Sequence, residues 1–213
     1  MNRAALTLTS VTKRFGSGPC STLALDRVTL DVVKGEFVSL IGPSGCGKTT
    51  ILRIVGGLTD QTLGEVTIFG ESPHQLQIRH EIGVAFQRSA LEPSRTALKN
   101  VELTLEVTEP RNRDRSKAQE LLVAFGLEDA LHKYPHELSG GMQQRVNIAA
   151  ALVHNPSVLL LDEPFGALDL LTRDMMAEWL GSVLLATPKT ALFVTHSDES
   201  VFAYGQGSSR SAL

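Results

Sequence analysis

The sequence predicts an α/β fold, in which a sheet of buried parallel strands carries a helical insertion, and three observations support this prediction. Apolar runs suited to strands occur near both ends of the chain. Between them, residues 87–155 change to a helical character. A glycine-rich loop directly follows one apolar run and precedes a helical segment, which is the order of a strand–loop–helix unit.

The first third of the chain is expected to be mostly β-structure. Residues 6–11 alternate apolar side chains with Thr and Ser, a pattern typical of a strand. A turn at 34–36 precedes a strand of five apolar and small residues, and a helix over 49–55 starts near Lys48 and ends at two glycines. The further strands predicted here are residues 23–25, 28–33, 37–41 and 66–69.

Two helices are predicted in the insertion, at residues 116–125 and 142–153. Asn155 stops the second helix, because a residue before proline avoids helical geometry. The apolar runs 158–161 and 191–195 then predict strands buried on both faces. In such sheets a ligand binds beyond the carboxyl ends of the strands, so the residues that follow each strand are the functional candidates.

Composition narrows the function classes. A chain of 213 residues suits one domain with a subdomain. A net charge of −3 argues against a dedicated nucleic-acid binder. Cys20 and Cys46 suggest no disulfide framework, which favours a reducing cytosol. No signal-peptide core and no apolar run of about 18 residues occurs, so any membrane role is expected to come through a partner.

The glycine-rich loop is the most informative motif. Its glycines allow backbone N–H groups to cradle phosphate oxygens, and the helix that follows directs its positive dipole end at the anion. Lys48 is expected to reach the β- and γ-phosphates, and the Thr49 hydroxyl to bind Mg²⁺. The sequence therefore predicts a site for ATP and Mg²⁺. The residues expected to contact the nucleotide are Gly42, Pro43, Ser44, Gly45, Cys46, Gly47, Lys48, Thr49 and Thr50.

Two carboxylates end the apolar strand 158–161 and form the second motif. Buried charge without a partner is costly, so Asp162 and Glu163 require a role. Beside Mg²⁺ and a triphosphate, Asp162 is expected to hold the metal, and Glu163 to act as the general base for the attacking water.

A third motif, residues 138–145, is less specific by itself. Ser139 is expected to cap a helix, and Gly140 and Gly141 leave backbone amides accessible at the helix start, which makes a second anion site. An ordinary capped helix remains the alternative from these residues alone.

The three motifs, in this order, resemble those of ABC-transporter ATPase subunits, and residues 138–145 resemble the signature sequence of that family. Phe15 stands where the family stacks an aromatic ring on adenine, and Gln87 where a glutamine touches Mg²⁺ and the attacking water. Asp169 stands in the loop that crosses to the partner subunit, and His196 where a histidine contacts the γ-phosphate. Taken alone, Phe15 would fit a core position and His196 an ordinary strand end.

The resemblance covers residues 6–203 and implies a P-loop NTPase core with a RecA-like parallel sheet, an N-terminal antiparallel β subdomain and an inserted helical subdomain. Within a single domain of residues 1–213, the core and β subdomain are expected at 1–86 and 156–213, and the helical signature subdomain at 87–155. It also implies a dimer, in which the phosphate loop of one copy faces Ser139, Gly140 and Gly141 of the other across ATP.

The resemblance further implies an ATPase whose hydrolysis is coupled to transport. The expected partners are a second copy of the chain, a membrane permease that docks near residues 87–100 and, through it, a solute-binding protein, at the cytoplasmic face of the membrane and without nucleic acid. Within the family, the chain is most similar to the ATPases of nitrate, sulfonate and taurine-type importers. Three segments support that similarity: 90–100, 138–145 and 162–169.

Two departures accompany this resemblance. Residues 92–95 lack the proline-tryptophan pair that is frequent in this subfamily. Relatives continue with apolar strands after residue 202, whereas residues 203–213 have no strand pattern, so a truncated or frame-shifted C-terminus is expected.

Three rival functions remain open. A soluble ABC-type ATPase would act on nucleic acid or ribosomes without a permease, but coiled-coil arms, cysteine pairs and tandem halves do not occur in this sequence. A P-loop kinase is disfavoured by the signature-like segment and the acidic pair. A non-catalytic remnant is the third rival, because of the C-terminal departure.

Overall fold

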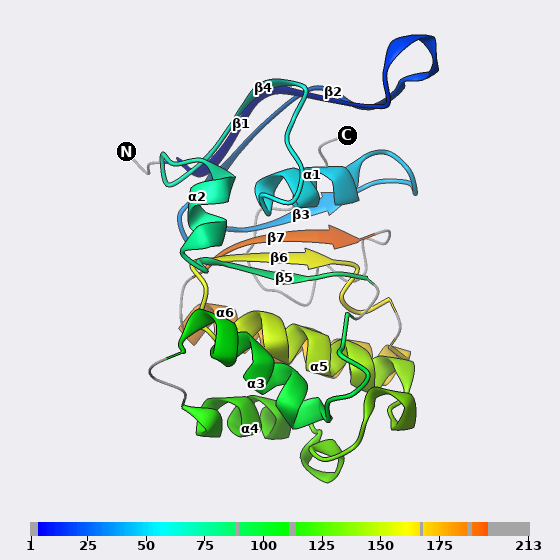
Figure 1. The fold of residues 1–213 in the computed structure, drawn as a ribbon, viewed down its shortest axis with the longest axis vertical. Coiled ribbons are helices and arrows are strands. Elements are labelled where there is room, and N and C mark those ends of the chain that lie inside the picture. The colour runs from blue at the N-terminus through cyan, green and yellow to red at the C-terminus, as the bar shows by residue number, and fades with distance from the viewer. Residues whose placement is uncertain (1–3, 88–89, 111–113, 167, 187–188, 196–213) are drawn as a thin grey trace.

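A parallel sheet of four strands forms the middle of the molecule in the part of the chain that the structure describes (Figure 1). The structure is a computed structural model and describes residues 4–87, 90–110, 114–166, 168–186 and 189–195. The strand order is β3, β7, β6, β5, and each neighbouring pair is parallel, so the four carboxyl ends meet at one edge. The strands are β3 Phe37–Ile41, β5 Ile82–Ala85, β6 Val158–Asp162 and β7 Thr190–Thr195.

The two central strands, β6 and β7, are buried on both faces, as their apolar sequences predict. Every residue of both strands is buried. Successive side chains of a strand point to opposite faces. Leu159 and Leu161 therefore pack into the core shared with the helices on one side of the sheet, and Leu160 packs into the core shared with α1 (Lys48–Val55) on the other.

An antiparallel sheet lies beyond α1 (Figure 1) and consists of β2 (Thr22–Val33), β1 (Ala4–Phe15) and β4 (Leu63–Ile68), in that order. The prediction of two short strands at 23–25 and 28–33 is wrong, because β2 is continuous. Arg27, at φ 50°, lies where the pairing register shifts, and its N–H donates to Thr12 Oγ1 at 3.1 Å. The bulge explains why the sequence pattern breaks while the strand continues.

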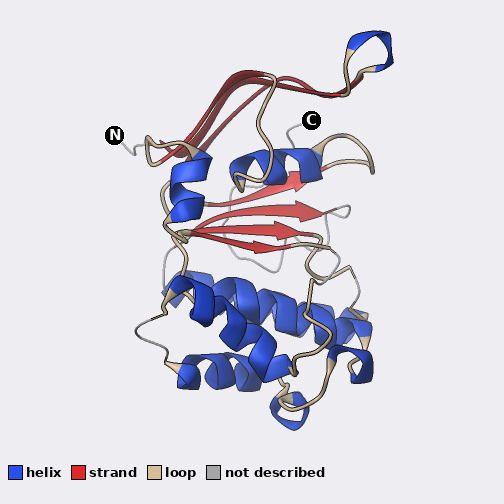
Figure 2. Ribbon diagram, in the orientation of Figure 1, coloured by secondary structure: helices blue, strands red, loops and turns tan. Residues whose placement is uncertain are grey.

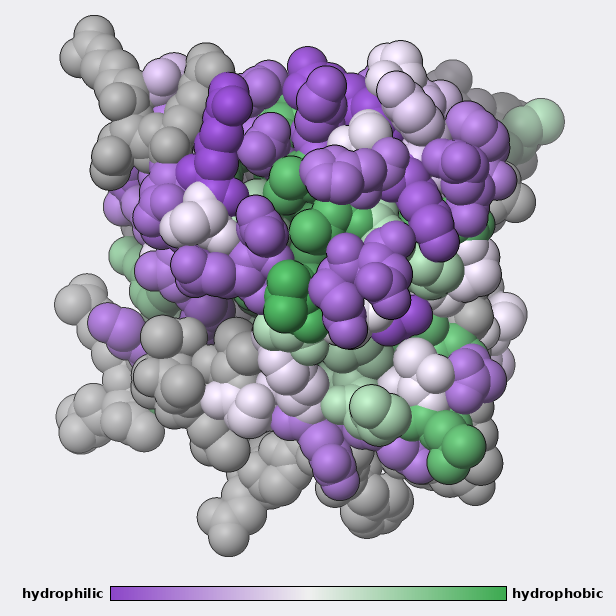
Figure 3. Space-filling view, turned by 90° about the horizontal axis from the view of Figure 1, so that it is seen from below, coloured by the Kyte–Doolittle hydropathy of each residue, from purple (hydrophilic) through white to green (hydrophobic). Residues whose placement is uncertain are grey.

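Helices form a separate layer on the other face of the parallel sheet (Figure 2). This layer holds one large apolar core, in which Trp179 packs on Phe125 with 4.1 Å between ring centroids. Its outer face is mostly hydrophilic, with apolar side chains gathered near the centre (Figure 3). None of the described helices is both long and apolar enough to span a bilayer. The helices of this layer are α3 Ala97–Thr108, α4 Arg115–Ala124, α5 Gly140–Leu152 and α6 Leu170–Ala186.

One strand and three α-helices have no counterpart among the predicted elements. These are β5, the short helix α2 (Pro73–Ile78), α6 and α3, which lies in the segment predicted only to be helical in character. The strand β5 contains only four residues, one of them glycine, and α6 is too apolar for a helical stripe to stand out. The helix α2 starts at a proline, and Ser72 and Gln75 form a capping box there.

Gly83→Ala is predicted to destabilise the fold. An added Cβ would overlap the carbonyl oxygen of Ala151 and lie 2.8 Å from Pro156 Cγ, where β5 packs on α5. Overpacking of this kind costs about 1–3 kcal/mol, and chemical denaturation should show a loss of that size in the free energy of unfolding. Gly140→Ala is the control, because its Cβ would meet no heavy atom within 4 Å. Equal stability of the two variants would contradict the close approach.

Candidate functional site

The glycine-rich loop connects β3 to α1 at the carboxyl edge of the parallel sheet. Gly45 and Gly47 have φ values of 81° and 104°, a region that glycine enters without steric cost. Gly47 is the N-cap residue of α1, and its carbonyl accepts from the Ile51 N–H at 3.0 Å. A Cβ at Gly47 would lie 2.6 Å from the Ala24 carbonyl oxygen, so this loop also depends on close contact with β2.

The ammonium of Lys48 is held inside the loop. Lys48 is only 4% exposed, and its Nζ donates to the carbonyl oxygens of Gly42 at 2.6 Å and Pro43 at 2.8 Å. A third contact, to the sulfur of Cys46, is 3.5 Å long. The positive charge is therefore stabilised by dipoles of the loop itself and lies among the residues expected to contact phosphate.

Thr49, on α1, and Asp162, at the end of β6, meet although they are 113 residues apart in the sequence. The Thr49 hydroxyl donates to Asp162 Oδ1 at 3.2 Å, and Asp162, the last residue of β6, is 4% exposed. Hydroxyl and carboxylate oxygens suit Mg²⁺, which keeps several waters and shares phosphate oxygens. Among the described residues, no group of three or more His, Cys, Asp or Glu side chains forms a metal cluster. The oxygen pair therefore fits a cation that is shared with a phosphate.

Gln87 and Glu163 form a second polar pair near the glycine-rich loop. Gln87 Nε2 donates to Glu163 Oε2 at 2.6 Å, which joins the segment after β5 to the segment after β6. Glu163 has φ 46°, a strained conformation for a residue with a side chain, and its N–H donates to the Val194 carbonyl at 2.9 Å. A cavity of about 310 Å³ lies between these groups. It is lined by Ala24, Ser44, Gly45, Gly47, Lys48, Thr49, Thr50, Gln87 and Glu163.

The third motif lies elsewhere. Ser139 caps α5, since its Oγ accepts from the Met142 N–H at 3.2 Å, and both Ser139 and Gly140 are exposed. The helix α5 is on the opposite face of the parallel sheet from α1 (Figure 1). Ser139, Gly140 and Gly141 are not among the residues that line the cavity, so the structure does not bring the two anion-binding motifs of one chain together.

Sequence reasoning missed two residues that connect these motifs. The side-chain amides of Gln144 and Asn147 on α5 donate to the carbonyl of Phe86 at 3.2 Å and 3.0 Å. Both side chains are buried, and Phe86 directly precedes Gln87. Two amides on a face otherwise made of Val, Ile and Ala are the sequence signal that could have indicated this contact.

Phe15 and Asp169 are not among the residues that line the cavity. Phe15 ends β1 and is 43% exposed, with the Lys13 ammonium 5.0 Å from its ring centroid. Asp169 accepts from the Thr172 N–H at 3.0 Å, and hydrogen bonding to Thr172 lowers the pKa of this carboxyl. His196 lies outside the described residues.

Comparison with known proteins assigns the family. A family model described as "ABC transporter" matches residues 25–166, which include the glycine-rich loop, the signature-like segment and the acidic pair. The chain belongs to the ABC transporter family. It is an ATP-binding domain of that family, an ATPase, as the resemblance of its motifs predicts.

Curated relatives of this ABC domain include import proteins. The chain is 44% identical to the taurine import ATP-binding protein TauB of Rhizobium johnstonii, over 85% of this chain and 69% of that protein. It is 42% identical to an uncharacterized ABC transporter ATP-binding protein of Methanocaldococcus jannaschii, over 94% of this chain and 75% of that protein. It is 45% identical to the aliphatic sulfonates import ATP-binding protein SsuB of Cupriavidus necator, over 90% of this chain and 61% of that protein.

Solved structures give the same result for the fold of the ABC domain. A dimeric ATP-binding cassette in a post-hydrolysis state, bound to ADP and Pi, superimposes with a TM-score of 0.87. That protein is 38% identical, and the alignment covers 93% of this chain and 90% of the other. A core with a parallel sheet, an antiparallel N-terminal sheet and a helical layer is thereby confirmed.

The variants Gly47→Ala and Gly45→Ala form a matched pair that tests the loop geometry. Both positions have positive φ, so each alanine carries a strain of about 1–2 kcal/mol. Only Gly47→Ala also drives a Cβ into the Ala24 carbonyl, whereas the Cβ at Gly45 would meet nothing within 4 Å. We expect Gly47→Ala to weaken nucleotide binding much more than Gly45→Ala, as measured by titration with a fluorescent ATP analogue. Equal affinities would argue against the close contact between the loop and β2.

Proposed function

We propose that this chain is the ATPase subunit of an importer for a small solute, of the nitrate, sulfonate or taurine type. The observation that carries the proposal is the meeting of Lys48, the Thr49–Asp162 pair and the Gln87–Glu163 pair around one cavity at the carboxyl edge of the sheet. The import names of curated relatives support the transport role, and the solute class rests on those names.

The loop and the start of α1 would bind the triphosphate. Amides of the first turn of α1 have no acceptor within the helix and direct positive partial charge toward an anion. Residues Gly42 to Thr50 surround the phosphates in this proposal, and Lys48 contributes its ammonium. Thr49, Gln87 and Asp162 would hold Mg²⁺, which neutralises phosphate charge when bound.

Hydrolysis would depend on Glu163. Its carboxylate accepts the proton of a water whose oxygen attacks the γ-phosphorus, while the bond from that phosphorus to the β–γ bridging oxygen breaks and ADP leaves. The Gln87 amide, 2.6 Å from Glu163 Oε2, orients this carboxylate. His196 would contact the γ-phosphate. The strained φ of Glu163 is consistent with a catalytic position, because such strain concentrates at active sites.

A second copy of the chain would complete the site. The exposed capped start of α5, with Ser139, Gly140 and Gly141, is an anion site that one chain does not bring to its own phosphate loop. In the proposed dimer these residues contact the nucleotide of the partner, Phe15 stacks on adenine, and Asp169 lies at the crossing loop. The dimeric state of a solved relative supports this arrangement.

The same proposal assigns the remaining partners. Residues 1–86 and 156–213 form the core with its β subdomain, and 87–155 the helical signature subdomain. The permease docks near residues 87–100 and at a neighbouring groove that Leu58 and Thr104 line, where Leu58 is 49% exposed. The chain then acts as a peripheral subunit at the cytoplasmic face of the membrane, with a solute-binding protein beyond the permease and no nucleic-acid partner.

Glu163→Gln should retain ATP binding, lose turnover by about 10²–10⁴-fold and accumulate as an ATP-bound dimer, because the amide cannot accept the proton of the attacking water. Phosphate release and sedimentation velocity measure the two effects. The control is Glu178→Gln, since Glu178 is an exposed carboxylate on α6. Turnover near that of the unmodified chain would remove Glu163 from its proposed role.

Lys48→Ala should bind ATP about 10–100-fold more weakly, which corresponds to the loss of a charge-assisted hydrogen bond of about 1.5–3 kcal/mol. Isothermal titration calorimetry gives the dissociation constant, and Lys133→Ala, an exposed lysine remote from the loop in sequence, is the control. An unchanged dissociation constant would contradict the proposed phosphate contact.

A further inference from the structure

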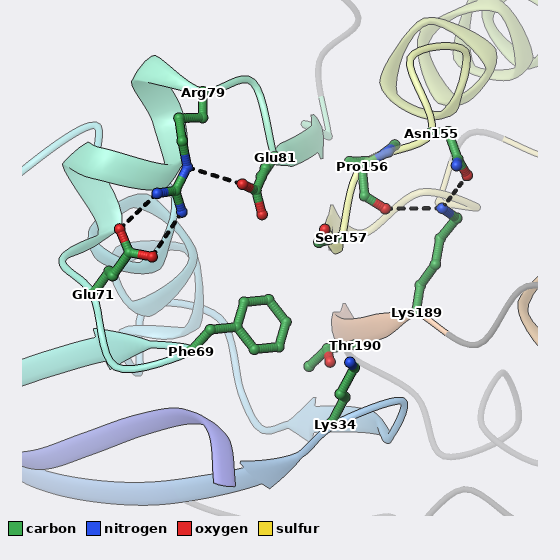
Figure 4. A pocket seen from close by; sticks show the side chains of 10 residues that line it. All are labelled: Lys34, Phe69, Glu71, Arg79, Glu81, Asn155, Pro156, Ser157, Lys189 and Thr190. Carbon is green, nitrogen blue, oxygen red and sulfur yellow. Dashed lines mark hydrogen bonds and ion pairs between the residues drawn. The ribbon is translucent and has the colours of Figure 1, made fainter.

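A second cavity, of about 510 Å³, lies at the opposite edge of the parallel sheet, where the strands begin (Figure 4). Its walls come from the segments that precede β3, β5, β6 and β7 and from the end of β4. The volume is within the range of small-molecule sites. The proposed reaction at the carboxyl edge uses none of these residues, so this cavity is a separate candidate.

One wall of this cavity is positively charged. Lys189 is 8% exposed, and its Nζ donates to Asn155 Oδ1 at 2.5 Å and to the Pro156 carbonyl at 2.8 Å. The described residues provide no carboxylate within ion-pair distance of Lys189, and burial lowers the pKa of its ammonium. Burying a charge without a counter-ion is costly, so an anionic group in the cavity would stabilise this side chain.

Lys34 adds a second cation to the same wall. It lies in the turn before β3, and the neighbouring Gly35 N–H donates to Thr190 Oγ1 at 3.1 Å, which fixes this turn against the start of β7. Both lysines therefore stand on backbone segments that other parts of the chain hold in place. The described residues of this wall that line the cavity include two lysines and no carboxylate.

The other wall has a net negative charge. The Arg79 guanidinium lies between two carboxylates, with contacts of 2.7 and 2.9 Å to Glu71 and 2.9 Å to Glu81. Hydrogen bonding to Arg79 lowers the pKa of Glu71. One cation between two anions leaves one negative charge. Phe69 lies between the two walls and is 37% exposed (Figure 4).

We propose that this cavity binds a small zwitterion, an amino-sulfonate or amino-carboxylate. Its anionic group faces Lys189 and Lys34, its ammonium faces Glu71 and Glu81, and its carbon chain lies against Phe69. A simple anion would satisfy the lysines but would face the negative wall, and a nucleotide would bring several negative charges to the same carboxylates. The opposite charges of the two walls therefore favour a ligand that carries both charges.

Calorimetry on the whole chain without nucleotide tests the proposal with three probes of similar size. 2-Aminoethanesulfonate carries both charges, ethanesulfonate lacks the ammonium, and ethylammonium lacks the anion. We expect 2-aminoethanesulfonate to bind with a dissociation constant of about 1 mM or below, and each singly charged probe to bind at least about tenfold more weakly. Equal binding of ethanesulfonate would overturn the zwitterion assignment, and failure of all three probes and of glycine and β-alanine would overturn the site.

Substitutions in the two walls test whether 2-aminoethanesulfonate binds in this cavity. Lys189→Met should lower the affinity for 2-aminoethanesulfonate by at least about tenfold. Lys99 is an exposed lysine on α3, and the control variant Lys99→Met should leave this affinity unchanged. Glu81→Gln should lower the affinity for 2-aminoethanesulfonate but not the affinity for ethanesulfonate, which has no ammonium group. Unchanged affinity in both Lys189→Met and Glu81→Gln would refute this location. The probe series on the unmodified chain needs no variant, and because nucleotide is absent, its outcome is independent of whether the chain hydrolyses ATP.

Discussion

The burial of β6 and β7 on both faces is the constraint on which the rest of the molecule depends. Alternate leucines of β6 enter two different cores, one shared with α1 and one with the helical layer. This double burial leaves polar groups only at the strand ends. Asp162 and Glu163 are therefore presented at the carboxyl edge, where Thr49 and Gln87 contact them. The polar side chains of the candidate site therefore gather at that edge, because the interiors of these two strands hold only apolar side chains.

The parts of the fold that could be predicted are those in which one local pattern decides the structure. Uniformly apolar runs predicted β6 and β7, and glycine and lysine at fixed spacing predicted the loop and α1. β5 and α6 could not be predicted in this way, because no local pattern marks them, whereas the capping box of Ser72 and Gln75 at the start of α2 is a local signal that the predictions did not use. α5 approaches β5 so closely that a side chain at position 83 would overlap its backbone, and the sequence carries no sign of that approach.

The candidate site follows the same division. Lys48, Thr49, Asp162 and Glu163 could be proposed from motifs, and the structure brings them together across segments more than a hundred residues apart. The amides of Gln144 and Asn147 could indicate a buried polar contact, but they could not identify Phe86 as its partner, because the acceptor is a backbone carbonyl and any residue has one. A sequence pattern can therefore predict which side chains form a site, but not which backbone groups they contact.

The carbonyls that hold Lys48 have a consequence for nucleotide entry. The carbonyls of Gly42 and Pro43 accept from two of the three N–H donors of the ammonium, so in the proposed site a phosphate would have to replace contacts that the loop makes with itself. The affinity for nucleotide would then be a difference between two sets of hydrogen bonds, with the carbonyls of the loop as internal competitors of the phosphate.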